Sequence, residues 1–328
     1  MATVDDKSYE VHNDDLSHHF NGTHEVLECP EDLDETEKHD PTSKCNKPHD
    51  KYILVKDLSP RHFPYGYQDN DLVNFTKLLS DLTVRISISY VSPDRPQFIS
   101  GTSAEYPGYK NRGKKALLVG TGKVWDVVKY AEDMDVPERT YRTCPCPKCL
   151  KSDTPEKVWW EAVVLTARHV VYDGEEASRS KCRLWYDSVQ TPVVNIYGFE
   201  LAGSYSNRDN CMFFCATHDL EVGEKLQIML DRFEDLWSSV WKKYKDRNDE
   251  ANIVIIVSHP HGNVKKVSVG HWVDRQEVSK NITRYTYTNS TCAGSSGALV
   301  YRLGYKVADH PHSGTNPTGL NYSGLEVD

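Results

Sequence analysis

The stretch from Thr291 to Val300 constrains the fold of this chain more than any other part of it. Its turn, Gly294 to Ala298, reads Gly-Ser-Ser-Gly-Ala and leads at once into a strand-like apolar run. So many small residues before a buried strand suit a site that presents a serine hydroxyl beside two backbone N–H donors. Because a serine hydroxyl alone is a weak nucleophile and needs a base, the rest of the chain must supply one.

A histidine and an aspartate stand upstream at similar positions. The apolar run from Trp159 to Val171 carries His169 near its end, and Asp209 lies just ahead of another apolar run that begins at Cys211. His169 and Asp209 are 40 residues apart, and Asp209 and Ser296 are 87 residues apart. Each of the three residues thus stands beside a strand-like apolar run.

Taken together, the three motifs resemble those of the trypsin-like serine proteases of chymotrypsin fold (PA clan). Where that family has L-T-A-A-H, residues 165–169 read Leu-Thr-Ala-Arg-His, and where it has G-[DN]-S-G-G, residues 294–298 read Gly-Ser-Ser-Gly-Ala. Where it has D-x-A-L-L, residues 209–213 read Asp-Asn-Cys-Met-Phe. The order histidine, aspartate, serine is also that of chymotrypsin. The resemblance extends over residues 72–325 and implies a serine endopeptidase that works through an acyl-enzyme.

The resemblance implies a mostly β fold of two six-stranded antiparallel barrels. The sequence adds an amphipathic helix, because apolar residues from Leu226 to Tyr244 recur with helical spacing; this stripe would pack against the barrels or a partner. Residues 10–50 are acidic and poor in large apolar side chains, a composition typical of disorder. The expected organisation is an acidic, His-rich, disordered tail (1–70), a first barrel (72–222) with a Cys-rich insert (132–156), an inter-barrel helix (223–250) and a second barrel (251–328).

The resemblance also assigns roles to individual residues. Ser296 would be the nucleophile, His169 the base, and Asp209 the carboxylate that orients the imidazole. The backbone N–H groups of Gly294 and Ser296 would form the oxyanion hole. Two alternatives stay open, Ser295 as nucleophile and Asp219 as acid. Three other histidines are interpreted as loop and strand residues rather than bases: His259, His261 and His271.

Substrate preference follows from the residues around the serine. Trypsins carry an Asp six residues before the nucleophile to receive Lys or Arg, and this chain has Ser290 there. Family members that cut after acidic residues use a Thr five residues before the serine and a His on the following strand, positions matched by Thr291 and by His310 or His312. We therefore expect cleavage after Glu or Gln rather than Lys or Arg. Asp309 in the pocket would reverse this preference.

Cysteine usage bears on metal binding and on compartment. The chain has nine cysteines and a polar, acidic N-terminus unlike a signal peptide, so we expect reduced thiols and a cytoplasmic protein; five N-x-[ST] sequons leave secretion as the alternative. Cys144, Cys146 and Cys149 could hold part of a structural Zn²⁺ site, or they could be free thiols on a stiff loop. Further possible ligands in the tail match no known zinc module: His18, His19, His24, Cys29, His39, Cys45 and His49.

Bulk composition excludes several function classes. The net charge of −9 opposes general affinity for nucleic acid or anionic membranes, and no apolar run reaches the 18 residues of a transmembrane helix. The expected partner is a peptide or protein substrate, and catalysis would need no cofactor. Two other functions remain open: a catalytically silent relative that acts as a binding or scaffold module, and a zinc-dependent binding protein.

Overall fold

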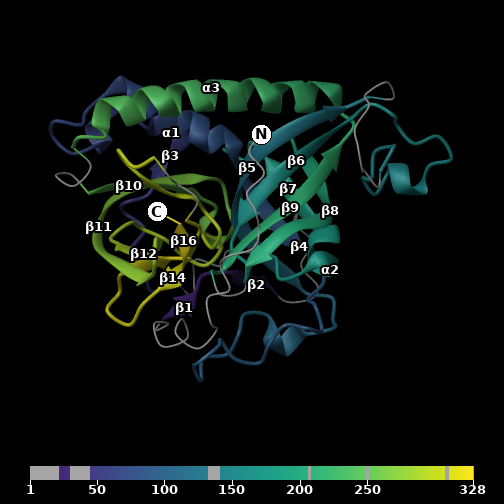
Figure 1. The fold of residues 1–328 in the computed structure, drawn as a ribbon, viewed down its shortest axis with the longest axis horizontal. Coiled ribbons are helices and arrows are strands. Elements are labelled where there is room, and N and C mark those ends of the chain that lie inside the picture. The colour runs from purple at the N-terminus through teal and green to yellow at the C-terminus, as the bar shows by residue number, and fades with distance from the viewer. Residues whose placement is uncertain are drawn as a thin grey trace.

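The computed structural model describes residues 22–29, 45–131, 141–205, 208–247, 252–306 and 310–327. Two antiparallel sheets form the body of the molecule (Figure 1). The strands of the first are β4 (Thr83–Ile88), β5 (Leu117–Tyr130), β6 (Trp159–Thr166), β7 (Ser180–Leu184), β8 (Val194–Tyr205) and β9 (Asn210–Thr217). They follow the order β5-β4-β7-β8-β9-β6, and β6 pairs back onto β5. The first sheet is therefore a closed barrel of six strands.

The second sheet also closes on itself. Its strands are β10 (Ile253–Ser258), β11 (Lys266–Ser279), β12 (Ile282–Tyr287), β13 (Val300–Arg302), β14 (His312–Thr315) and β15 (Asn321–Ser323). Their order is β14-β15-β12-β11-β10-β13. The remaining gap is bridged by the N–H of Val300, which donates to the carbonyl of His310 at 2.9 Å, and by the N–H of His312, which donates to the carbonyl of Ala298 at 2.7 Å. The expectation of two six-stranded antiparallel barrels is confirmed.

Each barrel has an apolar interior, because strand side chains alternate between the inside and the outside of the sheet. Ile86, Val164 and Phe213 belong to the core of the first barrel. Val254 and Tyr287 belong to that of the second. These residues are fully buried. The loops at the junction of the barrels are therefore anchored at both sides by a packed barrel core.

In the part of the chain that the structure describes, three helices flank the barrels: α1 (Asn70–Leu82), α2 (Gly174–Ser178) and α3 (Leu220–Tyr244). Short 3₁₀ turns occupy Val55–Asp57, Pro60–His62, Tyr109–Asn111, Cys149–Lys151 and Pro260–Gly262. The expected inter-barrel helix is present as α3, which begins where Asp219 accepts a hydrogen bond from the N–H of Val222 at 3.1 Å. Among the described residues, no helix is long and apolar enough to cross a membrane.

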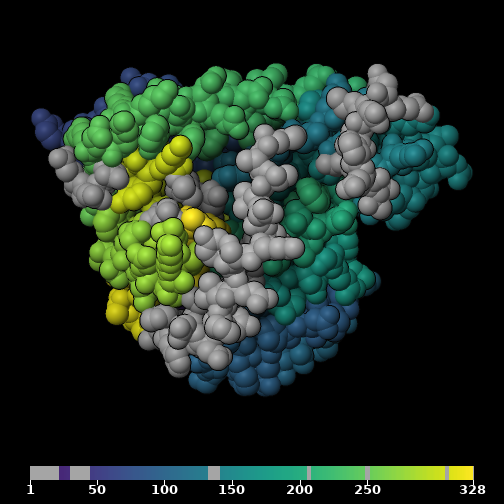
Figure 2. Space-filling model, in the orientation of Figure 1, coloured from purple at the N-terminus to yellow at the C-terminus, as the bar shows by residue number. Residues whose placement is uncertain are grey.

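The apolar stripe of α3 packs inside this chain and joins the two barrels. Leu226 and Leu230 belong to the core of the first barrel, whereas Val240 and Tyr244 belong to the cluster around α1 and the second. Phe233 lies between them and stacks on Phe75 of α1, with ring centroids 5.3 Å apart. Figure 2 shows α3 as a continuous band along one edge of the molecule.

Parts of the predicted disordered tail take defined positions. β1 (Thr23–His24) pairs with β14, β2 (Leu27–Cys29) with β5, and β3 (Ile53–Leu54) with β11. Residues 45–69 lead through 3₁₀ turns into α1, which the sequence analysis had left unassigned. For these segments the disordered interpretation does not hold, since their few apolar residues, such as Leu58 and Phe63, are buried. His18, His19 and His39 lie outside the described residues, as do 132–140 of the Cys-rich insert and Asp309. At the other end, β16 (Glu326–Val327) pairs with β12.

Candidate active site

The structure brings His169, Asp209 and Ser296 together where the two barrels meet. His169 follows β6, Asp209 precedes β9, and Ser296 lies in the turn before β13. The Nε2 atom of His169 is 2.6 Å from the Oγ atom of Ser296. Its Nδ1 atom is 2.9 and 2.8 Å from the two carboxylate oxygens of Asp209. The imidazole thus connects the hydroxyl to the carboxylate.

A buried ion pair that the sequence analysis missed holds the turn of His169. Arg95 and Glu176 form two hydrogen bonds of 2.6 Å, and neither side chain is exposed. The guanidinium also donates to the carbonyls of His169 at 2.9 Å and of Val170 at 3.1 Å. Because a buried guanidinium with all these partners has one orientation, Arg95 determines where the backbone of His169 lies.

Asp209 has a left-handed backbone, with φ of 55°. It accepts hydrogen bonds from the N–H of His169 at 3.0 Å and from the hydroxyl of Ser313 at 2.6 Å. Burial raises the pKa of Asp209, but the charge and hydrogen bond of His169, together with the bond from Ser313, outweigh burial and lower it well below its usual range. The carboxylate is therefore ionised near neutral pH.

The turn of Ser296 is braced by the first barrel. Thr121 of β5 donates its N–H to the carbonyl of Ser296 and its hydroxyl to the carbonyl of Gly294, both at 2.8 Å. Gly294 and Gly297 have φ of 95° and 85°, a region that favours glycine. A side chain at Gly297 would come within 2.1 Å of the Thr166 hydroxyl. The small residues of the motif are thus needed for the turn itself.

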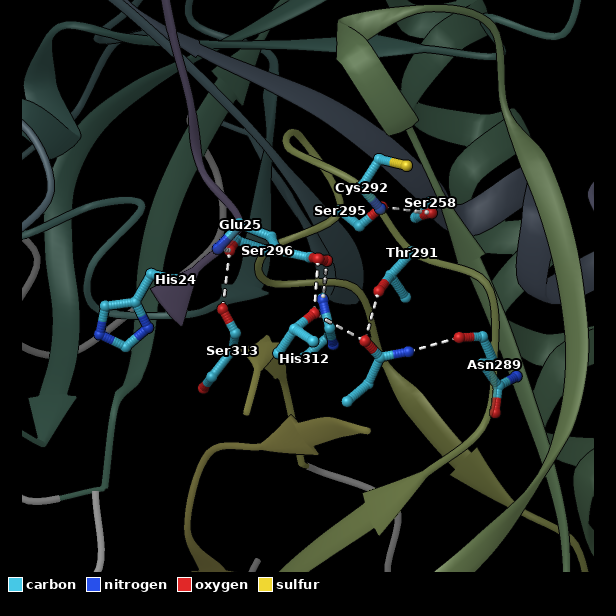
Figure 3. A network of polar contacts seen from close by, with 12 residues as sticks. His24, Glu25, Ser258, Asn289, Thr291, Cys292, Ser295, Ser296, His312 and Ser313 are labelled. Carbon is cyan, nitrogen blue, oxygen red and sulfur yellow. Dashed lines mark hydrogen bonds and ion pairs between the residues drawn. The ribbon is translucent and has the colours of Figure 1, made fainter. Parts of the chain in front are cut away.

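The two alternative candidates lie elsewhere. The hydroxyl of Ser295 is buried and contacts the hydroxyl of Ser258 at 3.1 Å and the N–H of Cys292 at 3.3 Å, as Figure 3 shows. Asp219 is the N-cap of α3. Neither residue has a described contact with His169.

The cleft already holds a segment of the chain, residues 23–29, which includes β1 and β2. The carbonyl oxygen of Glu25 accepts from the N–H of Gly294 at 2.6 Å, and the N–H of Ser296 lies 3.4 Å from it. These are the two N–H groups that the sequence assigned to the oxyanion hole. The N–H of Glu25 donates to the carbonyl of Ser313 at 3.1 Å and lies 3.0 Å from the Oγ of Ser296. Figure 3 shows Glu25 between Ser296, Ser313 and His312.

The side chain of Glu25 enters a polar pocket. Its carboxylate lies 2.7 Å from the Nε2 of His312 and 2.7 Å from the hydroxyl of Thr315. It also forms an ion pair with Lys47. Burial raises the pKa of Glu25, but the hydrogen bond from His312 and the contact with Lys47 lower it below its usual range. The pocket therefore stabilises a carboxylate.

Of the other residues expected to contact substrate, none touches this carboxylate directly. The hydroxyl of Thr291 donates to Asn321 at 2.9 Å, and Asn321 also lies 2.9 Å from the hydroxyl of Thr315. His310 contacts Thr283 of β12 at 3.0 Å. Ser290 donates its N–H to the hydroxyl of Ser268 at 2.7 Å. His312, rather than His310, faces the bound carboxylate, and Lys47 was missed because it lies almost 250 residues from Ser296 in the sequence.

Two clusters of cysteine and histidine could hold metal ions. Cys144, Cys146 and Cys149 meet His218, the fourth donor that the sequence analysis could not identify. A second cluster joins Cys45 and His49, two of the possible ligands named in the tail, with His261 and Cys292 beside the serine turn, which were not predicted as ligands. Within each cluster the donor atoms all lie within 4.8 Å of one another.

Comparisons with known proteins find similar solved structures, among them two proteases. No family model and no curated protein matches the chain. The Rv3671c protease in its inactive form is 10% identical, with 78% of this chain and 90% of that chain covered and a TM-score of 0.37. The HtrA-type protease AlgW, solved with a decapeptide, is 10% identical, with 76% and 61% covered and a TM-score of 0.38. By its two closed barrels and the three residues at their junction, this chain has the fold of the trypsin-like serine proteases.

Proposed function

We propose that this protein is a serine endopeptidase with His169, Asp209 and Ser296 as its catalytic triad. One observation carries the proposal. The Nε2 of His169 lies 2.6 Å from the Oγ of Ser296, while the N–H groups of Gly294 and Ser296 face one carbonyl oxygen in the same cleft. A nucleophile with its base and two donors aimed at a carbonyl oxygen is the arrangement that acyl transfer requires.

The geometry supports the following mechanism. Ser296 attacks the carbonyl carbon of the bound peptide, and its proton passes to the Nε2 of His169. The negative charge that develops on the carbonyl oxygen is stabilised by the N–H groups of Gly294 and Ser296. Asp209, held ionised by its partners, orients the ring and stabilises the imidazolium. His169 then protonates the leaving amine, and water hydrolyses the acyl-enzyme by the same steps.

We further propose that the enzyme cuts after glutamate. A carboxylate in this pocket meets the imidazole of His312, the hydroxyl of Thr315 and the ammonium of Lys47. Burial lowers the pKa of His312, so at neutral pH the ring is neutral, with Nε2–H donating to the carboxylate. Its Nδ1 lies 2.7 Å from the hydroxyl of Tyr287, which also lies 3.1 Å from the carbonyl of Tyr322. A Lys or Arg side chain would lie beside Lys47 with its charge unpaired.

The test is active-site labelling with a fluorophosphonate together with cleavage of glutamate-containing peptides. The wild-type chain should be labelled on Ser296 and should cleave the peptides once residues 23–29 have left the cleft. Ser296→Ala and His169→Ala should each lower turnover by several orders of magnitude, and the double variant should be little worse, because triad members act as a unit. Ser295→Ala is the matched control and should keep both properties.

The competing function is a silent scaffold with the same fold. It predicts no labelling and no turnover in any variant with an accessible cleft. Loss of activity in Ser295→Ala together with retained activity in Ser296→Ala would show that Ser295, not Ser296, is the nucleophile.

A further inference from the structure

We propose that the protein cleaves its own chain between Glu25 and Val26. This inference rests on the proposed endopeptidase function and adds a defined substrate bond to it. It follows from the path of the bound segment, residues 23–29, which crosses the cleft in an extended form and contacts both barrels on either side of Ser296.

The residues before Glu25 are held on the second barrel. β1 pairs antiparallel with β14, with Thr23 opposite Thr315 and His24 opposite Gly314. Gly314 is required for this approach, because a side chain there would lie 1.8 Å from the carbonyl of Thr23. The N–H of Glu25 extends the same ladder by donating to Ser313.

His24 covers the catalytic imidazole. Its ring stacks on that of His169, with centroids 3.9 Å apart and planes 12° from parallel. Burial and the charge of His169 lower the pKa of His24 to about 3, so at neutral pH the two rings stack without charge on His24. Tyr322 closes this side of the ring, its hydroxyl lying 3.5 Å from the Nδ1 of His24.

The residues after Glu25 are held on the first barrel. β2 pairs antiparallel with β5, and Leu27 lies opposite Val119. Val26, whose nitrogen would be the leaving group, is buried, 8% exposed. The peptide bond between Glu25 and Val26 is therefore fixed from both ends, with its carbonyl oxygen against the N–H of Gly294. Because the bond is already held in the cleft, its cleavage avoids the entropy loss that binding a separate substrate would carry.

The cleavage reaction needs only the triad and one water molecule, and no cofactor. The Oγ of Ser296 bonds to the carbonyl carbon of Glu25, and its proton passes to His169. The bond from that carbon to the nitrogen of Val26 breaks, and the nitrogen takes the proton from His169. One water then hydrolyses the ester and leaves two chains, one that ends at the new carboxylate of Glu25 and one that begins at the new amine of Val26.

The experiment follows the full chain by intact mass and by N-terminal sequencing. Wild type should separate into residues 1–25 and 26–328, at a rate independent of protein concentration because the reaction is intramolecular. Ser296→Ala should stay intact. Glu25→Lys should also stay intact, because its ammonium would face Lys47 in the pocket. Because the bound segment then leaves the cleft, a fluorophosphonate should label Ser296 of Glu25→Lys faster than Ser296 of wild type. Glu234→Lys makes the same charge change at an exposed position of α3, outside the bound segment, and should still be cut.

The outcomes separate the two proposals. A chain that stays whole while Glu25→Lys is labelled and cleaves a glutamate peptide refutes self-cleavage and leaves the endopeptidase function standing. Absence of labelling and turnover in Glu25→Lys refutes the endopeptidase itself. A cut at any other bond, or a rate that rises with protein concentration, also refutes cleavage of this bond within one chain.

A second inference has an independent basis: the structure assigns Zn²⁺ to the cluster of Cys45, His49, His261 and Cys292. Its donor separations are 3.6 Å between the two sulfurs, 3.4 Å between Cys292 and His49, and 3.1 Å between the Nε2 atoms of His49 and His261. Tetrahedral Zn²⁺ at usual bond lengths gives about 3.8, 3.6 and 3.4 Å for these pairs. His261 has a left-handed backbone with φ of 58°, a strain common at ligand sites.

The cluster of Cys144, Cys146, Cys149 and His218 also has donor separations close to those of tetrahedral Zn²⁺. His218, which directly follows β9, brings its Nδ1 atom to 3.4 Å from the sulfur of Cys146 and 3.3 Å from that of Cys149. The N–H of Cys149 points to the sulfur of Cys146 at 3.5 Å. Cys144 completes the donor set. We therefore assign a second structural Zn²⁺ to Cys144, Cys146, Cys149 and His218.

Metal analysis of the full chain in the Ser296→Ala background tests both sites. We expect two Zn²⁺ per chain, with one lost in Cys45→Ser and one lost in Cys146→Ser. Cys29→Ser, outside both clusters, should keep two. Replacement with Co²⁺ should give thiolate charge-transfer absorption that falls in each ligand variant, including His49→Ala, which changes only an exposed side chain. Folded protein without zinc, or a zinc content unaffected by Cys45→Ser and His49→Ala, would refute the assignment.

Discussion

Replacing His312 tests the proposed glutamate pocket most directly. His312 is fully buried and donates to the glutamate carboxylate at 2.7 Å. A hydrogen bond to a charged group contributes about 1.5–3 kcal/mol, and one to a neutral amide about 0.5–1.5 kcal/mol. Because about 1.36 kcal/mol corresponds to a tenfold rate change, His312→Ala should lower kcat/KM about 10- to 150-fold for a glutamate peptide. For a glutamine peptide the loss should be about 2- to 10-fold, so the preference for glutamate over glutamine falls about tenfold.

The assay compares Glu25→Lys with Glu25→Lys/His312→Ala, so that the bound segment does not block the cleft in either protein. The substrates are peptides of sequence Gly-Thr-His-X-Val-Leu, taken from residues 22–27, with X as Glu, Gln or Lys. His312→Gln, which keeps a donor, should recover part of the preference. Equal losses for the glutamate and glutamine peptides would refute the pocket, because only the charged side chain should lose the charge-assisted bond. Strong cleavage after Lys in the parent protein would refute it as well.

Three further predictions concern the supports of the site, each measured in the Ser296→Ala background unless stated. Arg95→Met should lower the free energy of unfolding by about 3–5 kcal/mol, measured by urea unfolding, because it leaves the carboxylate of Glu176 buried and unpaired; an unchanged midpoint would contradict this. Asp209→Asn should be less stable than its parent at pH 5, by a margin that narrows as the pH falls below about 4, because a carboxylate with a lowered pKa stabilises the fold above its unfolded-state pKa and loses that effect as the pH falls through the folded-state pKa; a margin that widens below about pH 4 would contradict this. Gly314→Ala, in a chain that keeps Ser296, should abolish self-cleavage without unfolding the barrels, because its methyl group would collide with Thr23; continued cleavage seen by intact mass would contradict the pairing of β1 with β14.

The sequence predicts those parts of the site whose residues sit in local motifs. His169, Asp209 and Ser296 each stand beside a strand with a recognisable apolar pattern, and the glycines around the serine are demanded by the turn. The two barrels were implied by the resemblance of these motifs to those of the trypsin-like serine proteases. α3 could be predicted because its apolar stripe is long and regular.

What the sequence could not supply depends on contacts between distant segments. Glu25 and Lys47 lie in an acidic stretch whose composition is typical of disorder. In the structure Glu25 stands between β1, which pairs with β14, and β2, which pairs with β5, and Lys47 contacts Glu25. The apolar pair Val26-Leu27 is a weak local signal that this stretch contains a strand. His218 was not predicted as a ligand because three cysteines specify neither the position nor the type of the fourth donor.

Self-cleavage would not by itself open the active site. The cut breaks one bond but leaves the pairing of β1 with β14 and the contacts of the Glu25 carboxylate unchanged, so the released chain still occupies the cleft. What changes is the covalent link between residues 1–25 and the rest of the chain. Before the cut, this link keeps the segment at a high effective concentration near the cleft. After the cut, the segment is a separate ligand that competes with substrate by mass action. Lys47 lies two residues from both Cys45 and His49, so bound zinc would hold the ammonium in place whether or not Glu25 is present. A preformed pocket binds the Glu25 carboxylate of the product as well as it binds the glutamate of a new substrate. Ser296 therefore becomes accessible to other substrates only when residues 1–25 leave the cleft, and not when the bond is cut.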